Sequence, residues 1–155
     1  MPFAWTDLVN VTASGSSLRK TSGCDGCPDA GAASVPTIPS GNGYTQFTAS
    51  ETNTLRFIGL STVSAGTSAT SIRFAIALQP GGIAEVRESG QYRADTPFVP
   101  GDVFRIGVQK NVIRYYKNET LIYKSTLPAV FPLRVDTALF TPNSTITNVG
   151  LYKTR

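Results

Sequence analysis

Apolar and polar residues alternate along most of this chain, and the alternation is clearest in its second half. Every second residue of Val103–Val108 is apolar, which places Arg105 and Gly107 on the opposite side. Polar turn residues follow, and two more segments of this kind come next, Val112–Lys117 and Thr120–Ser125. A repeat of two residues between turn signals indicates β-strands. The stretch therefore predicts three antiparallel strands joined by tight turns.

Similar short segments occur elsewhere in the chain, and no window of ten or more residues has the 3.6-residue repeat of a helix. The further predicted strands are Trp5–Ala13, Ser17–Thr21, Ala30–Ile38, Tyr44–Ala49, Leu55–Leu60, Ile72–Leu78, Ile83–Glu88, the short segment Gln91–Arg93, Phe131–Phe140 and Thr145–Tyr152. Pro36 and Pro39 interrupt the third of these and predict a position at a sheet edge. So many strands favour two packed sheets over one open sheet. We expect an all-β, two-sheet antiparallel sandwich that forms one domain over residues 1–155.

Composition narrows the functions open to such a domain. Of the 155 residues, 41% are hydrophobic and only 15% are charged, which suits strands and turns better than surface helices. The net charge is +4, but the basic residues are dispersed, which argues against nucleic-acid binding. No apolar run reaches the length of a membrane span, so membrane insertion is not expected. The absence of histidine excludes catalysis by a Ser-His or Cys-His pair.

The two cysteines, Cys24 and Cys27, lie in the sequence Gly-Cys-Asp-Gly-Cys-Pro. Two cysteines without a histidine cannot supply the four ligands of a Cys/His zinc site. A local disulfide that closes this loop is the favoured interpretation, and it fits an exported protein. Two reduced thiols in a turn remain the alternative, because the spacing alone does not fix the redox state. The expected location is therefore extracellular or at the cell surface.

Several segments resemble a known group of domains. Asn-Gly-Tyr-Thr-Gln-Phe at 42–47, followed by Phe-Ile-Gly-Leu-Ser at 57–61, is similar to a pair of strands in SPRY-like modules. Gly-Asp-Val-Phe at 101–104 and Ile-Arg-Tyr-Tyr-Lys-Asn at 113–118 resemble their central meander. Pro132-Leu133 and Ile146–Val149 continue the likeness, which covers residues 42–152. The wider group is the concanavalin A-like lectin/glucanase superfamily, and bacterial modules of this sort resemble the chain best.

This resemblance implies a two-sheet jelly roll, often attached to exported proteins and often able to bind glycans. One position departs from the pattern: the usual Asn-Gly turn is Asn118-Glu119 here. A type I′ turn needs positive φ at both central residues, which glutamate disfavours. The sequence therefore predicts either another turn type or a strained turn.

The central strands also predict a candidate ligand-binding face. If the apolar positions point inward, the opposite face carries Arg73, Arg87, Arg105, Arg114 and Tyr116 around a shallow groove above small residues, Ala75, Ala77 and Gly107. Arginine binds oxygen-rich ligands through two parallel hydrogen bonds, and a tyrosine ring stacks on the apolar face of a sugar. We expect the arginines and Tyr116 to bind a ligand. Arg105, Arg114 and Tyr116 share two adjacent strands, with Arg73 and Arg87 flanking them. The alternative is an ordinary solvent-facing sheet, with the small residues packed under a loop.

These observations favour a non-catalytic, lectin-like carbohydrate-binding module without a cofactor or metal, and the arginines favour an anionic glycan. Glycanases of the superfamily need paired carboxylates, and no such array is present, so no enzyme activity is expected. Isolated pairs such as Glu85 with Glu88, or Asp95 with Asp102, occur readily by chance. A calcium site would need several converging oxygens, for which Asp25, Asp29 and Asp136 are the candidates. The alternative function is a structural or protein-interaction domain of a surface, adhesive or viral assembly, in which a homo-oligomer is expected.

Overall fold

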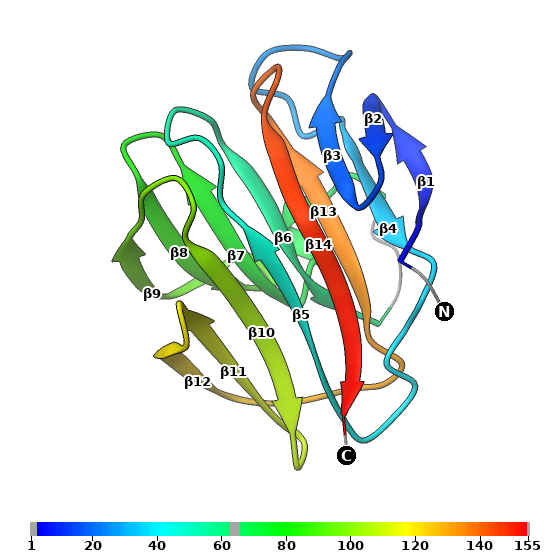
Figure 1. Cartoon of the computed structure of the whole chain (residues 1–155), viewed down its shortest axis with the longest axis vertical. Helices are drawn as coiled ribbons and strands as arrows, with labels where there is room; N and C mark the ends of the chain where they lie inside the picture. Colours follow the sequence, from blue (N-terminus) through cyan, green and yellow to red (C-terminus); the bar gives the residue numbers. More distant parts are fainter. Residues whose placement is uncertain (1–2, 63–65, 155) are drawn as a thin grey trace.

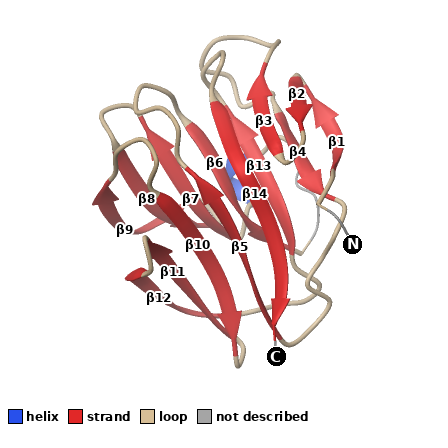
Figure 2. Cartoon of the chain, viewed as in Figure 1, coloured by secondary structure: helices blue, strands red, loops and turns tan. Residues whose placement is uncertain are grey.

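The computed structural model describes residues 3–62 and 66–154, and these form two antiparallel seven-stranded sheets packed face to face (Figures 1 and 2). The first sheet has the strand order β1-β4-β13-β6-β7-β8-β9, and the second has the order β12-β11-β10-β5-β14-β3-β2. The only helical segment in the described residues is the 3-10 turn η1 (Ala69–Ser71), drawn in blue in Figure 2. The all-β jelly-roll sandwich expected from the alternation is therefore confirmed.

The strands of the first sheet, in chain order, are β1 (Trp5–Val9), β4 (Gly31–Ser34), β6 (Arg56–Ser61), β7 (Phe74–Gln79), β8 (Ile83–Glu88), β9 (Gln91–Pro97) and β13 (Arg134–Leu139). Those of the second sheet are β2 (Val11–Ser14), β3 (Ser17–Lys20), β5 (Asn42–Thr48), β10 (Val103–Gln109), β11 (Val112–Lys117), β12 (Thr120–Pro128) and β14 (Thr145–Thr154). The chain passes between the sheets repeatedly, so strands that are close in sequence often belong to different sheets.

The core lies between the two sheets and is built from the apolar side of each strand. Phe104 of β10 stacks on Phe47 of β5, with ring centroids 5.6 Å apart, and Phe98 meets Phe104 edge-on at 6.1 Å. Burying rings of this size supplies much of the driving force for such a fold. Six residues at apolar positions predicted to point inward lie in this core, which confirms their side of the strand: Phe74, Ile76, Phe104, Ile106, Ile113 and Tyr115.

Two N-terminal predictions were wrong. The predicted strand Trp5–Ala13 is two strands, because Asn10 adopts a positive φ of 55° and the chain changes sheet there. The segment containing Pro36 is not at an edge: β4 ends before that proline and lies between β1 and β13, with all its residues buried. Its small side chains, Gly-Ala-Ala-Ser, allow that close packing.

A second, smaller apolar cluster lies on the outer side of the first sheet. Ile72 is the first apolar position of the predicted strand Ile72–Leu78, whose apolar positions were expected to face the main core, but it packs instead with Ala69 of η1, Ala75 of β7 and Ala138 of β13. The strand β7 begins two residues later than expected, at Phe74, because the chain leaves η1 only after Ile72. The turn segment therefore covers part of this outer face.

The two hairpin turns of the central meander both have left-handed central residues. Lys110 and Asn111 have φ of 50° and 66°, and Asn118 and Glu119 have φ of 48° and 69°. Positive φ at both positions is the type I′ pattern, so the Asn118-Glu119 turn keeps the geometry expected of Asn-Gly. Of the two alternatives for this turn, the strained one holds. A non-glycine residue in this region costs about 1–2 kcal/mol.

Candidate functional site

The candidate site lies on the outer face of the second sheet, over β5, β10 and β11. Arg105 stands directly opposite Gln46 on one neighbouring strand and Tyr116 on the other. Gly107 is likewise opposite Tyr44 and Arg114. In an antiparallel sheet, directly opposed residues project to the same side, so these side chains form one surface.

Two adjoining hollows in this surface share Arg105. The first has a volume of about 250 Å³ and is lined by Asn42, Gly43, Tyr44, Arg105, Gly107, Val108, Gln109, Arg114, Tyr116 and Thr154. The second has a volume of about 330 Å³ and is lined by Gln46, Val103, Arg105, Asn118 and Glu119. We call the two hollows together the groove. Its floor is open at Gly107, where an added Cβ would meet only the Tyr44 Cβ at 3.4 Å and the Gly43 carbonyl at 3.5 Å.

The groove contains two arginine side chains, Arg105 and Arg114. The Arg105 guanidinium lies over the Tyr44 ring, 4.2 Å from its centroid, and donates a hydrogen bond to Gln46 Oε1 at 3.1 Å. Among the described residues no carboxylate forms an ion pair with Arg105 or Arg114. Both side chains are half-buried. The site therefore combines two arginine forks with aromatic rings, a set suited to oxygen-rich ligands with an apolar face.

Arg105, Arg114 and Tyr116 therefore lie together, as the sequence predicted, but Arg73 and Arg87 do not flank them. Arg87 is on β8 and Arg73 immediately precedes β7, and both strands belong to the first sheet. The prediction that these two residues border the same groove was wrong, because it assumed that the central strands share one sheet.

The outer face of the first sheet differs from the groove in two ways. The Arg87 guanidinium donates to Glu85 Oε1 from Nε at 2.9 Å and from Nη2 at 2.6 Å, so its charge is neutralised. Ala75 and Ala77 are fully buried and form no groove floor. A hollow of about 420 Å³ does exist on this face, lined by Leu55, Phe57, Thr70, Gln79, Pro80, Arg87, Gly90 and Phe140.

Sequence reasoning missed the contribution of β5 and β14 to the groove. Tyr44 and Gln46 come from β5, and Tyr152 of β14 packs on Tyr44 with ring centroids 4.9 Å apart. Alternation in the segment around Tyr44 places it and Gln46 on the outer side. Only the pairing of β5 with β10, which are far apart in sequence, brings them beside Arg105.

The acidic pairs considered for catalysis do not flank a common cleft. Glu85 and Glu88 project from opposite faces of β8. Glu88 is buried, where it accepts hydrogen bonds from the Tyr115 hydroxyl at 2.9 Å and from Arg93 Nε at 3.1 Å. Burial, together with the Glu88 charge, raises the pKa of Tyr115 far above its ordinary value. The buried hydrogen bond between Tyr115 and Glu88 links β11 of the second sheet to β8 of the first, so these residues have a structural role.

Asp95 and Asp102, the other acidic pair, have separate structural roles. Asp95 accepts a hydrogen bond from the Tyr92 hydroxyl on β9. Asp102 accepts hydrogen bonds from the Val99 backbone N–H at 2.9 Å and from Asn118 Nδ2 at 2.9 Å, which fixes the loop before β10.

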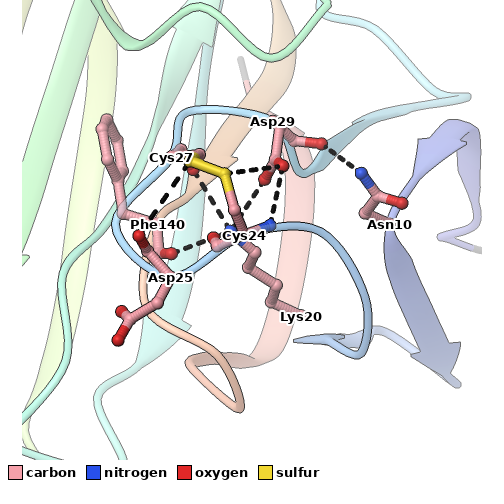
Figure 3. Close-up of a disulfide and its surroundings, with 7 residues drawn as sticks. All are labelled: Asn10, Lys20, Cys24, Asp25, Cys27, Asp29 and Phe140. Carbon is pink, nitrogen blue, oxygen red and sulfur yellow. Dashed lines mark hydrogen bonds and ion pairs between the residues drawn. A yellow bond between two sulfur atoms is a disulfide. The ribbon is translucent and has the colours of Figure 1, made fainter.

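The loop between β3 and β4 contains a disulfide between Cys24 and Cys27, whose Cα atoms are 5.4 Å apart (Figure 3). The buried Lys20 ammonium lies under this loop. It donates to the carbonyl oxygens of Cys24 at 2.6 Å, Cys27 at 3.2 Å and Phe140 at 2.8 Å, and to Asp29 Oδ1 at 2.8 Å. The hydrogen bond from Lys20, with that from the Cys24 backbone N–H, holds the pKa of Asp29 below its ordinary value.

The same loop holds the one cluster of metal-ligand residue types in the described part of the chain, Cys24, Cys27 and Asp29. The two sulfur atoms are bonded to each other, and the Asp29 carboxylate already accepts hydrogen bonds from Lys20 and the Cys24 backbone. The Lys20 ammonium group thus lies among the carbonyl oxygens of Cys24 and Cys27 and the Asp29 carboxylate, where a metal cation would otherwise bind. Figure 1 shows this loop at the opposite end of the molecule from the β10–β11 turn.

Comparison with known proteins identifies the fold. No protein-family model and no curated protein matches the sequence. The structure is similar to the exoplasmic/lumenal domain of VIP36 in its Ca²⁺/Man3GlcNAc-bound form, with a TM-score of 0.67 and 8% identity over 99% of this chain and 84% of that one. It is also similar to the TRIM65 PSpry domain, with a TM-score of 0.62 and 11% identity over 99% of this chain and 93% of that one.

A third similar structure is the alginate lyase AlgAT5 from Polysaccharide Lyase family 7, with a TM-score of 0.54 and 15% identity over 89% of this chain and 69% of that one. All three are concanavalin A-like jelly rolls, and this chain has the same fold. Identities this low show a common architecture only. Within the described residues, no helix is long and apolar enough to cross a membrane.

Proposed function

We propose that this domain is a non-catalytic, lectin-like carbohydrate-binding module of an exported protein, and that it binds a glycan in the groove over β5, β10 and β11. The observation that carries the proposal is the pair Arg105 and Arg114, which have no carboxylate partner among the described residues and stand beside Tyr44 and Tyr116 above the open floor at Gly107. Guanidinium groups donate to sugar oxygens, and the rings cover the apolar faces of sugar rings.

The composition of the groove supports binding without catalysis. Among the residues that the structure describes, Glu119 is the one carboxylate that lines either hollow, whereas glycoside hydrolysis uses a pair. The chain has no histidine to act as a general base, and its cysteines lie elsewhere. VIP36, a structural neighbour, was solved with Man3GlcNAc bound, which is consistent with glycan binding on this architecture. The disulfide agrees with an extracellular or cell-surface location.

A glycan array followed by isothermal titration calorimetry of the strongest hit tests this function. Replacing Arg105, Arg114 or Tyr116 by alanine should each weaken binding about tenfold or more, as expected for contacts at the centre of a site. Arg19→Ala is the matched control. It removes the same charge from an exposed position on β3 of the same sheet and should leave affinity nearly unchanged.

Two results would overturn the proposal. Cleavage of the bound glycan, followed by chromatography of the products, would show that the domain is an enzyme. No binding to any glycan, together with an ordered homo-oligomer in light scattering, would favour the structural or protein-interaction function instead.

A further inference from the structure

The groove is elongated in one direction. Residues of β10 line it in sequence, with Val103 and Arg105 in the second hollow and Arg105, Gly107 and Gln109 in the first. At about 3.3 Å per residue, the seven residues of β10 span about 20 Å. That length exceeds a single sugar ring, so the shape suits a linear chain of sugars that lies along the strand.

The charges along this axis are distributed unevenly. Arg114 lines the first hollow, and Lys124 of β12 stands opposite it and is exposed. Neither forms an ion pair with a carboxylate in the described residues, whereas Arg56, Arg87 and Arg93 each lie within 4.0 Å of one. The opposite end of the groove carries Glu119, in the Asn118-Glu119 turn.

The two arginines of the groove also differ in how they are held. Arg105 is already engaged, over the Tyr44 ring and on Gln46 Oε1. Arg114 has no hydrogen-bond partner among the described residues, so its planar fork is available to a ligand. A half-buried guanidinium without a partner favours an anionic oxygen group, to which it donates two parallel hydrogen bonds.

We propose that the groove binds a linear acidic glycan along β10, with the acidic group of one sugar at Arg114 and an uncharged sugar beside Glu119. This inference rests on the proposed glycan-binding function and adds the class and direction of the ligand. Glu119 repels a second acidic group at its own end, so the groove selects the position of the charge as well as its sign. Carboxylate and sulfate share the chemistry that Arg114 recognises.

Calorimetry with three oligosaccharides of equal length tests the inference. The first is an oligomer of uronic acids, the second is the same oligomer with its carboxylates reduced to primary alcohols, and the third is a sulfated oligosaccharide. The reduced oligomer should bind about tenfold more weakly than its acidic parent or worse, because charge-assisted hydrogen bonds are lost. Stronger binding of the sulfated oligomer than of the uronic acid would identify sulfate as the acidic group.

Two variants locate the charge. Arg114→Gln should weaken binding of the acidic oligomer about tenfold or more and binding of the reduced oligomer by a smaller factor, so that most of the preference for the acidic oligomer is lost. Glu119→Gln should strengthen binding of the fully acidic oligomer about two- to fivefold, because a like charge is removed. Arg19→Gln removes the same charge as Arg114→Gln, but from β3, and should leave the affinity for both oligomers nearly unchanged.

The outcomes distinguish failure of the acidic-glycan inference from failure of the proposed glycan-binding function. Equal affinity for the acidic and reduced oligomers, with both lost in Tyr116→Ala, would overturn the acidic ligand and leave glycan binding in place. No binding of any of the three oligomers, together with no hit on the glycan array, would overturn both the acidic-glycan inference and the proposed glycan-binding function. A preference for acid that survives Arg114→Gln would place the charge elsewhere and contradict the assigned direction.

Discussion

The outer faces of the two sheets carry similar side chains but engage them differently. On the first sheet Arg87 is neutralised by Glu85, and Ala75 lies buried under the segment around η1. On the second sheet no carboxylate within residues 3–62 and 66–154 pairs with Arg105 or Arg114, and the floor at Gly107 is open.

The two faces differ in whether their arginines are paired because the residues beside each arginine differ. Glu85 sits two residues from Arg87 on the same face of β8. The residues directly opposite Arg105 and Arg114 on the neighbouring strands are Gln46, Tyr116, Gly107 and Lys124, and none of them is a carboxylate. Arginine and small residues therefore make a candidate site only where the adjoining strands leave them unpaired and uncovered.

The largest expected effect concerns the core beneath the groove, at adjacent positions of β10. Phe104→Ala should cost about 3–5 kcal/mol of unfolding free energy, because it leaves a cavity beside Phe47 and Phe98. Arg105→Ala, one residue along, should cost less than about 1 kcal/mol. Urea denaturation of both variants measures this. A loss under 1 kcal/mol for Phe104→Ala would show that the inner and outer sides of β10 are reversed.

A smaller effect compares the two outer faces at their small residues. Ala75→Leu should destabilise the protein by about 1–3 kcal/mol, since the added carbons must enter the packed cluster with Ile72 and Ala138. Gly107→Ala should change stability by less than about 1 kcal/mol but weaken glycan binding, because its Cβ fills the groove floor. Thermal melts and calorimetry together test this. Equal destabilisation at both positions would remove the distinction between a covered and an open face.

The disulfide should affect neither face. Its loop is short, so reduction should lower the unfolding free energy by about 2 kcal/mol or less and leave glycan binding unchanged. Thiol titration of freshly purified, unreduced and denatured protein should find no free thiols. Two titratable thiols would show that Cys24 and Cys27 are reduced, and a loss of binding on reduction would show that the loop communicates with the groove.

Much of the fold follows from local pattern. The bounds of β8 and β11 agree with their predicted segments, because both alternate between clear turn signals. The full extent of β9 was missed, since Arg93-Ala-Asp-Thr has no regular alternation and this edge strand forms through pairing with β8. Local pattern also failed at Asn10. The segment around it alternates like a single strand, and only packing moves the chain from the first sheet to the second.

The candidate site was predictable where its residues share a hairpin. Arg105, Arg114 and Tyr116 lie on β10 and β11, which a short turn joins, so their common face follows from register. Arg87 was misplaced because alternation fixes which side of a strand a residue faces but not which sheet the strand joins. Tyr44 was missed for the converse reason, since the pairing of β5 with β10 is distant in sequence.

One arginine from each outer face distinguishes a glycan site in the groove from one in the hollow of the first sheet. Calorimetric titration of the glycan that binds the wild-type protein should show at least a tenfold loss of affinity for Arg114→Ala and little change for Arg87→Ala, with both variants melting near the wild-type temperature. For an acidic glycan, wild-type affinity should also fall as salt rises, because exposed charges are screened over about 8 Å at physiological ionic strength. Loss of binding in Arg87→Ala with full affinity in Arg114→Ala would place the site in the hollow of the first sheet and not in the groove over β5, β10 and β11.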